Sequence, residues 1–246
     1  MALLAIVPKH ASEAKPGDAA EFLREARAWL KMFPEDGNEL VIFDNKLPPK
    51  VRARALTAQL ERFRGRDFRA VGFFMHGLRD SIQTGHTCNI RRQPGYAPVV
   101  ELAETLRAIM AAKPIVPLYA CDAARDGNLT RADDKDAGPG GDDGFADGLR
   151  DAMIALDHVW ARDGHVDAHI TPGHTTTNKF VRRFRCNPLP HELTLGMVGG
   201  DWIVDPRDRK LWAAWNKALG SPARKGTLRL RFPFLTVRQI HAELGG

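Results

Sequence analysis

Cysteine is scarce in this chain, with only Cys88, Cys121 and Cys186 among its 246 residues. So few cysteines, odd in number, do not make the disulfide framework of a small secreted protein, so we expect reduced thiols and a cytoplasmic location. Long apolar runs are also missing, since no stretch approaches the roughly 20 apolar residues of a membrane-spanning helix. The lysine of segment 1–10 follows its apolar stretch, unlike that of a signal peptide. We therefore predict no membrane partner, and a first strand or packed arm at residues 1–10.

Glycine-rich phosphate-binding motifs are absent as well. The Gly-Pro-Gly-Gly run at 138–141 follows no predicted strand, so it indicates a loop rather than a nucleotide site. The net charge is +6, but the basic residues are spread along the chain and no cluster lies in a recognised nucleic-acid-binding motif. We expect a solvated basic surface rather than a specific nucleic-acid partner.

Apolar segments of strand and helix type alternate through the first two thirds of the chain. Asp18 precedes an apolar stripe at helical spacing and is expected to cap that helix. Pro114 is expected to end a second amphipathic helix. The alternation predicts an α/β fold with a mostly parallel sheet flanked by helices on both faces. The predicted strands are 39–43, 69–75, 115–120 and 165–171, and the predicted helices are 18–30, 48–63, 99–110 and 145–160.

No convincing domain boundary is visible, so the whole chain, residues 1–246, is predicted to be one domain. Segment 125–144 is rich in aspartate and glycine and is expected to be a mobile surface loop. The C-terminal part, 187–246, has a less regular pattern than the rest.

Two predicted strands end in residues with catalytic chemistry. One ends at His76-Gly77, and the other ends at Ala120-Cys121. Reactive groups of a parallel sheet gather at the carboxyl ends of its strands. A nucleophilic thiol needs an imidazole for proton transfer and two backbone N–H groups to hold the oxyanion. Gly77 would let a substrate carbonyl approach the backbone closely, because it has no side chain.

These two strand ends resemble those of the caspase-like cysteine peptidases, the group of caspases, metacaspases, legumains and gingipains. The matching segments are Val-Gly-Phe-Phe-Met-His-Gly at 71–77 and Ile-Val-Pro-Leu-Tyr-Ala-Cys at 115–121. Their separation, 121 − 76 = 45 residues, is close to the roughly 50 residues of caspases. The resemblance covers about residues 38–175.

The resemblance implies a cysteine endopeptidase that acts on peptide or protein substrates without a cofactor or a metal. His76 would be the general acid and base, and Cys121 the nucleophile that forms a thioester. The N–H groups of Gly77 and Cys121 would form the oxyanion hole. Family members are often cut in a loop shortly after the cysteine, where segment 125–144 lies.

The sequence departs from the family pattern around the cysteine. Tyr119 stands where many members have an acidic or amide residue that lines the specificity pocket, so no cleavage preference is carried over. Asp122 replaces the arginine that follows the caspase cysteine. We expect Tyr119 and Asp122 to contact substrate. Asp44, at the end of a predicted strand, could contact a basic substrate residue or form a turn. Pro117 removes a ladder hydrogen bond and predicts a bulge or an unpaired stretch.

Other interpretations remain open. A catalytically inactive caspase-like binding or scaffold domain would keep the same fold, and another cysteine hydrolase could pair Cys121 with His174. His86 and Cys88 are potential zinc ligands but too few for a zinc signature. His165 and His169 share one strand face, yet no acidic partner for a metal is evident.

Overall fold

The computed structural model describes residues 2–13, 15–34, 36–124, 144–169 and 181–186. The predictions made for segment 187–246, for His174 and, except for Gly144, for segment 125–144 lie outside these residues.

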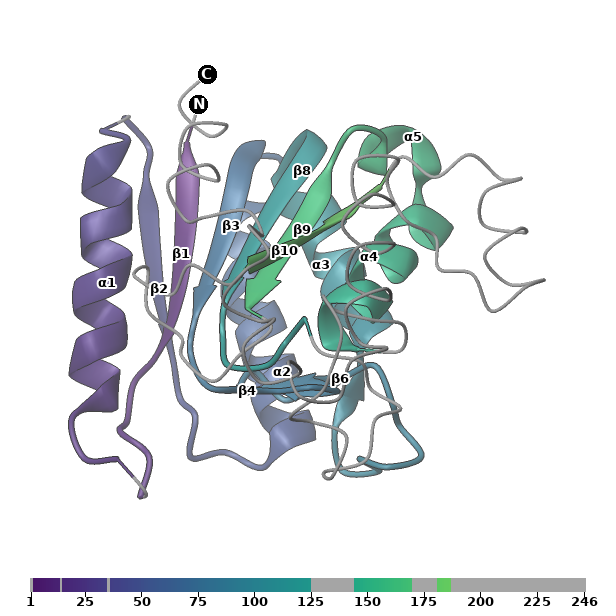
Figure 1. Cartoon of the computed structure of the whole chain (residues 1–246). Coiled ribbons are helices and arrows are strands. Elements are labelled where there is room, and N and C mark those ends of the chain that lie inside the picture. Colours follow the sequence, from purple (N-terminus) through teal and green to yellow (C-terminus); the bar gives the residue numbers. More distant parts are fainter. Residues whose placement is uncertain (1, 14, 35, 125–143, 170–180, 187–246) are drawn as a thin grey trace, which may run out of the picture.

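A six-stranded sheet forms the centre of the molecule, in the order β10-β9-β8-β3-β1-β2 (Figure 1). All neighbouring strands are parallel except β10, which pairs antiparallel with β9. The predicted α/β class with a mostly parallel sheet is confirmed. The strands are β1 (Leu3–Pro8), β2 (Glu39–Phe43), β3 (Phe68–Phe74), β8 (Met110–Tyr119), β9 (His165–His169) and β10 (Val181–Arg185).

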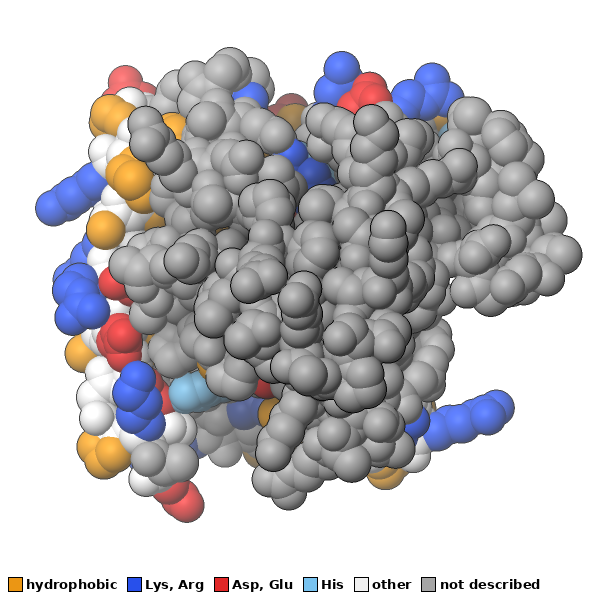
Figure 2. All heavy atoms as spheres, viewed as in Figure 1, with side chains coloured by type: hydrophobic (Ala, Val, Ile, Leu, Met, Phe, Trp, Pro, Cys, Tyr) orange, Lys and Arg blue, Asp and Glu red, His pale blue; other side chains and the backbone are white. Residues whose placement is uncertain are grey.

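Helices cover both faces of this sheet. Helix α1 (Asp18–Met32) packs Phe22, Ala26 and Trp29 against one face. Fully burying one large apolar side chain of this kind contributes about 1.5–3 kcal/mol. Figure 2 shows charged side chains of both signs along the outer side of α1, where Arg24 and Arg27 are exposed. The other face is covered by α2 (Pro49–Leu60), η1 (Glu61–Phe63), α3 (Val99–Ile109), α4 (Phe145–Leu156) and α5 (His158–Ala161).

The strand order creates a switch point between β1 and β3. Strand β1 pairs with β2 on one side and with β3 on the other. The chain therefore leaves β1 in one direction along the sheet and returns to it from the opposite direction through β3. Ligands of open α/β sheets bind in the crevice that such a reversal leaves at the carboxyl ends of the strands.

A small second sheet follows His76 and was not predicted. It contains β4 (Gly77–Leu78), β5 (Ser81–Ile82), β6 (His86–Thr87) and β7 (Ala97–Pro98). In Figure 1 it lies beyond the carboxyl ends of the central strands. The small sheet therefore forms one wall of the crevice.

Two local predictions need correction, and the alternatives for Pro117 are decided. The cap of α1 is Gly17, with a φ of 98°, and Asp18 is the first helical residue without a capping bond. Helix α3 ends at Ile109 and β8 starts at Met110, so Pro114 lies inside the strand instead of ending the helix. Pro117 causes no bulge, because Ala70–Ile115 and Phe73–Leu118 keep one register across it, but Val116 and Pro117 have no partner on β3, so the expected unpaired stretch is present. The irregularity of the ladder lies between Phe68 and Ala70.

Within the described residues, no helix is both long enough and apolar enough to cross a bilayer.

Candidate active site

The ends of β3 and β8 lie side by side. The two strands are parallel, with Phe74 opposite Tyr119, and the Met75 N–H donates to the Tyr119 carbonyl at 3.3 Å. His76 and Cys121 each follow two residues after this pair. Phe74 and Tyr119 both pack in the apolar cluster on the α1 side, and the His76 ring also lies on that side, in contact with Phe22 of α1.

Gly77 lies directly against the residues around Cys121. A Cβ atom at Gly77 would lie 2.8 Å from the Ala120 Cβ and 2.9 Å from the Cys121 carbonyl oxygen. Real Cβ atoms do not approach other atoms so closely, so no other residue fits here without a shift of the backbone. The glycine therefore serves the close approach of two strand ends, a reason different from the open substrate path that the sequence suggested.

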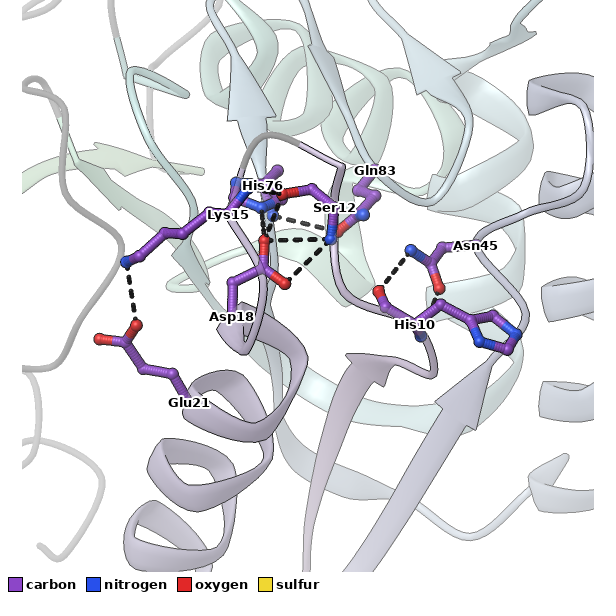
Figure 3. A network of polar contacts seen from close by, with 8 residues as sticks. All are labelled: His10, Ser12, Lys15, Asp18, Glu21, Asn45, His76 and Gln83. Atoms are coloured by element: carbon purple, nitrogen blue, oxygen red, sulfur yellow. Dashed lines mark hydrogen bonds and ion pairs between the residues drawn. The ribbon is translucent and has the colours of Figure 1, made fainter.

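A buried carboxylate holds the His76 ring (Figure 3). His76 Nε2 contacts Oδ2 of Asp18, whose side chain is 1% exposed, whereas the His76 side chain is 33% exposed. The Ser12 hydroxyl donates to the same Asp18 oxygen at 2.6 Å, and the Ser12 N–H donates to Oδ1 at 3.1 Å. Phe22 packs its ring edge to face with the imidazole, at 5.1 Å between centroids. Ser12, in the loop after β1, and two residues of α1, Asp18 and Phe22, therefore set the orientation of the His76 ring together.

Hydrogen bonds keep Asp18 ionised. Burial alone would raise the pKa of Asp18, but the hydrogen bonds from Ser12 and His76 outweigh burial and hold the pKa below its usual value. Because Nε2 faces this carboxylate, Nδ1 is the ring nitrogen that can exchange a proton with a thiol. In enzymes with a Ser-His-Asp triad, a carboxylate orients the catalytic histidine in the same manner.

The backbone around the two strand ends can supply oxyanion donors. The Gln83 N–H donates to the His76 carbonyl at 3.0 Å, and the Gln83 side-chain oxygen accepts the His76 N–H at 3.2 Å. Gly77 and Ile82 then form a non-hydrogen-bonded pair of the β4–β5 ladder, so the hairpin does not use the Gly77 N–H. Asp122 has a φ of 55°, a left-handed conformation that turns the chain sharply just after Cys121.

A cavity of about 380 Å³ opens beside His76. It lies at the switch point between β1 and β3, next to the small second sheet. Its polar lining comes from Ser12, Arg52, His76, Ser81, Gln83 and Tyr96, and the rest from Gly77, Leu78 and Ile82. Cys121 does not line this cavity, and neither do Asp44, Tyr119 and Asp122.

The structure gives other positions to the residues predicted to contact substrate. Tyr119 is 2% exposed and stacks on Phe74 at 4.5 Å between ring centroids, so it is a core residue and its predicted substrate contact is wrong. Asp44 accepts the Lys46 N–H at 3.0 Å and pairs with His10 at 3.4 Å, which supports its turn-forming role. Asp122 is half-buried in the turn that follows Cys121.

The histidines considered as metal ligands have other partners. His86 Nδ1 bonds the Thr84 hydroxyl at 2.9 Å, and the Cys88 thiol faces the Asp80 carbonyl at 3.5 Å. His165 lies 3.3 Å from Asp167, whose two carboxylate oxygens accept from Arg183 at 2.8 and 2.9 Å. No group of three or more potential metal ligands occurs in the part of the chain that the structure describes.

No protein-family model matches the chain, and no curated protein is significantly similar to it. The geometry of the site therefore carries the functional argument alone.

Two important residues of this site escaped sequence reasoning. Asp18 carried the signal of a helix cap, and only the folded chain shows its carboxylate at His76. Arg52 was only one of the basic residues spread along the chain, yet it lines the cavity. The available signal was position: Asp18 opens the helix after β1, and Arg52 lies in the first turn of the helix after β2.

Proposed function

We propose that this chain is a cysteine peptidase of caspase-like type, with Cys121 as nucleophile and His76 as general acid and base. The observation that carries the proposal is the packing of Gly77 against Ala120 and Cys121, which brings the histidine and cysteine strand ends together. The buried Asp18 at His76 adds support, because a structural surface histidine has no need of a buried and doubly hydrogen-bonded carboxylate.

The proposed reaction has two halves. His76 takes the thiol proton of Cys121, and the thiolate sulfur attacks the carbonyl carbon of a peptide bond. The resulting oxyanion accepts hydrogen bonds from the Gly77 and Cys121 N–H groups. As the C–N bond breaks, the imidazolium gives its proton to the leaving nitrogen, and an acyl thioester remains on Cys121.

In the second half, water replaces the amine. His76 accepts a proton from the attacking water, the water oxygen bonds to the thioester carbon, and the C–S bond breaks. The acid product leaves and the Cys121 thiol regains its proton from the imidazolium. Asp18 holds the ring in the orientation that both halves need, and it stabilises the imidazolium by its negative charge.

The test is cleavage of a peptide library by the wild type and by Cys121→Ala. We expect the variant to lose activity by a factor on the order of 10³ or more, because the nucleophile is gone. Cys88→Ala is the matched control, since Cys88 is also half-buried and should leave cleavage unchanged. Equal activity of the wild type and Cys121→Ala would refute the proposal.

A second candidate is a non-catalytic binding domain with the same fold. The burial of Tyr119 favours it to some extent, because the strand that carries Cys121 offers no polar specificity residue at that position. Such a domain would show no cleavage with any peptide and no difference in thiol reactivity between Cys121 and Cys88.

A further inference from the structure

The cavity beside His76 is lined by a cation whose hydrogen-bonding capacity is only partly used. Arg52 lines the cavity and is half-buried, and its Nη1 donates to the Asn45 carbonyl at 2.5 Å. Its Nε lies buried with no hydrogen-bond partner. A buried guanidinium N–H without an acceptor costs free energy, so the described residues leave part of the hydrogen-bonding capacity of Arg52 unmet.

The buried imidazole ring of His86 lies close enough to Arg52 for the arginine charge to affect its pKa. His86 is 1% exposed, and its Nε2 also has no hydrogen-bond partner. Burial, followed by the charge of Arg52, lowers the pKa of His86 to about 4, so His86 is neutral at neutral pH. The positive charge at this wall of the cavity therefore belongs to Arg52.

No carboxylate of the described residues lines the cavity to neutralise Arg52. The other lining side chains are hydroxyls, an amide, aliphatic groups and the His76 ring. Asp44 acts on Arg52 only from outside the cavity, where it pairs with His10. A cationic, partly apolar pocket of this composition suits a short side chain that ends in a carboxylate, because arginine binds carboxylates through parallel N–H donors.

The position of the cavity indicates which part of a substrate enters it. During acylation, Cys121 bonds to the acyl carbon while His76 protonates the leaving nitrogen. The leaving residue must therefore pass the histidine, on the side away from the sulfur. The cavity is lined by His76, Gly77 and Leu78 but not by Cys121, so it adjoins the group that would protonate the leaving nitrogen and not the sulfur.

We infer that this cavity binds a carboxylate on the leaving-group part of the substrate, with Arg52 as its counter-ion. The inference rests on the proposed function for its naming of the leaving group. The carboxylate has two possible sources, an acidic side chain directly after the scissile bond or the terminal carboxylate of a short leaving peptide.

The binding experiment separates the inference from catalysis. Cys121→Ala protein is titrated by calorimetry with Asp-Ala-amide, Asn-Ala with a free carboxylate, and Asn-Ala-amide. We expect one of the two carboxylate-bearing dipeptides to bind at least about ten-fold tighter than Asn-Ala-amide, and which of them does so identifies the source. Arg52→Gln should remove that difference, whereas Arg54→Gln, an exposed arginine two residues along α2, should keep it.

A cleavage experiment then tests on which side of the cleaved peptide bond the bound carboxylate lies. The products of a peptide library are sequenced for the wild type, Arg52→Gln and Arg52→Glu. We expect the carboxylate identified by titration to be enriched after the cleaved bond in the wild type, to lose its enrichment in Arg52→Gln, and to give way to lysine or arginine in Arg52→Glu.

The outcomes are distinguishable. Carboxylate binding without any cleavage would sustain the subsite and refute the peptidase. Cleavage with an acidic preference before the bond, or with no acidic preference, would overturn the inference and leave the peptidase standing. Equal weak binding of all three dipeptides to the Cys121→Ala protein would overturn it as well.

Discussion

Cys121 and the other two cysteines differ in surroundings, and this difference is measurable by alkylation. Burial raises the pKa of Cys186 to about 12, so that thiol is almost wholly protonated at neutral pH. Cys88 is half-buried with its thiol directed at the Asp80 carbonyl. Cys121 follows β8 beside the strand end that carries His76, so in the proposed mechanism proton exchange with the imidazole would form the thiolate.

We therefore expect iodoacetamide to label Cys121 at least about ten-fold faster than Cys88 or Cys186 at neutral pH. Peptide mapping by mass spectrometry gives the three rates in one sample. His76→Ala should slow the labelling of Cys121 and leave that of Cys88 unchanged. Equal and slow labelling of all three thiols would favour the non-catalytic binding domain.

Asp18 offers a separate test of how His76 is held. Asp18→Asn preserves the shape of the side chain but removes its charge, so the ring loses the anion that orients it and stabilises its protonated form. We expect kcat to fall about 10²–10⁴-fold with little change in KM. Ser12→Ala removes only the hydroxyl that donates to the same carboxylate and should lower kcat less.

The matched control is Glu21→Gln, three residues along α1, where Glu21 pairs with Lys15 at the surface at 3.0 Å. It should leave kcat unchanged. If Asp18→Asn lowered the melting temperature while kcat of the folded protein stayed at the wild-type value, Asp18 would be a structural residue only.

At this scale the sequence predicted residue types better than residue roles. The histidine and cysteine were selected as candidates because each ends an apolar run, a pattern that local sequence carries. Asp18 was assigned to a helix cap because its true partner, His76, lies 58 residues away. Arg52 was missed for the same reason, since only the fold brings it to the wall of the cavity beside His76.

Among the elements, the contact between β3 and β8 is the most sensitive to a small change. Gly77→Ala would place a methyl group 2.8 Å from the Ala120 Cβ, so the two strand ends must separate. We expect a loss of about 1–3 kcal/mol in the free energy of unfolding, together with a loss of cleavage activity. Urea denaturation followed by circular dichroism measures the first, and peptide cleavage measures the second.

Gly95→Ala is the control for this substitution, because nothing lies within 4 Å of a Cβ at that position. Full activity and unchanged stability of Gly77→Ala would mean that the ends of β3 and β8 are farther apart in solution, and the proposed pairing of His76 with Cys121 would fail.

The edge of the sheet depends on a buried ion pair. Asp167 of β9 accepts two hydrogen bonds from Arg183 of β10, and both side chains are buried. Burial alone would raise the pKa of Asp167, but His165 and Arg183 outweigh burial and lower it to about 2. Asp167→Asn leaves the Arg183 charge buried without its counter-ion, so we expect a loss of about 3–5 kcal/mol in the free energy of unfolding.

The pH dependence follows from the same pair. The folded pKa of Asp167 lies below its unfolded value, so its stabilisation is complete above the unfolded pKa, about 4, and is lost as the pH falls toward 2. We expect this term to be on the order of 2 kcal/mol in the wild type and absent from Asp167→Asn. Urea denaturation at pH 7, 4 and 3 measures it. Asp163→Asn, in an exposed pair with Lys113, is the control; equal pH slopes in all three proteins would contradict the assignment.

Element boundaries show where local patterns stop being informative. The alternation of strands and helices was predicted because each long element carries its own apolar period. Pro114 was expected to end α3 because residues 110–113 carry no helix breaker, but the pairing of Met110 with Phe68 of β3 starts β8 there. The two-residue strands β4 to β7 have no period at all, so the wall that they form was invisible in the sequence.

For the whole molecule, the strand order is the property that local sequence does not contain. The switch between β1 and β3 places the Ser12 loop, His76 and Arg52 around one cavity, although they come from three separate segments of the chain. The same order brings β9 next to β8, where the Ala124 N–H donates to the His169 carbonyl at 2.9 Å. The chain therefore enters segment 125–144 directly from the neighbourhood of Cys121.

This path of the chain predicts where self-cleavage would occur and which residue would follow the cut. Segment 125–144 begins four residues after Cys121 (125 − 121 = 4) and contains several aspartates. Acidic residues that could follow a cleaved bond therefore lie close to Cys121 along the chain. We expect the purified protein to cut itself within this segment on incubation. If the carboxylate that Arg52 binds is an acidic side chain, each new N-terminal residue should be aspartate. Intact mass and N-terminal sequencing measure both.

Cys121→Ala should remain uncleaved, and Arg52→Gln should be cut more slowly or before other residues. One intact band from a preparation that cleaves added peptides would discard self-cleavage. If titration has identified an acidic side chain, cuts before non-acidic residues would instead count against the assignment of Arg52.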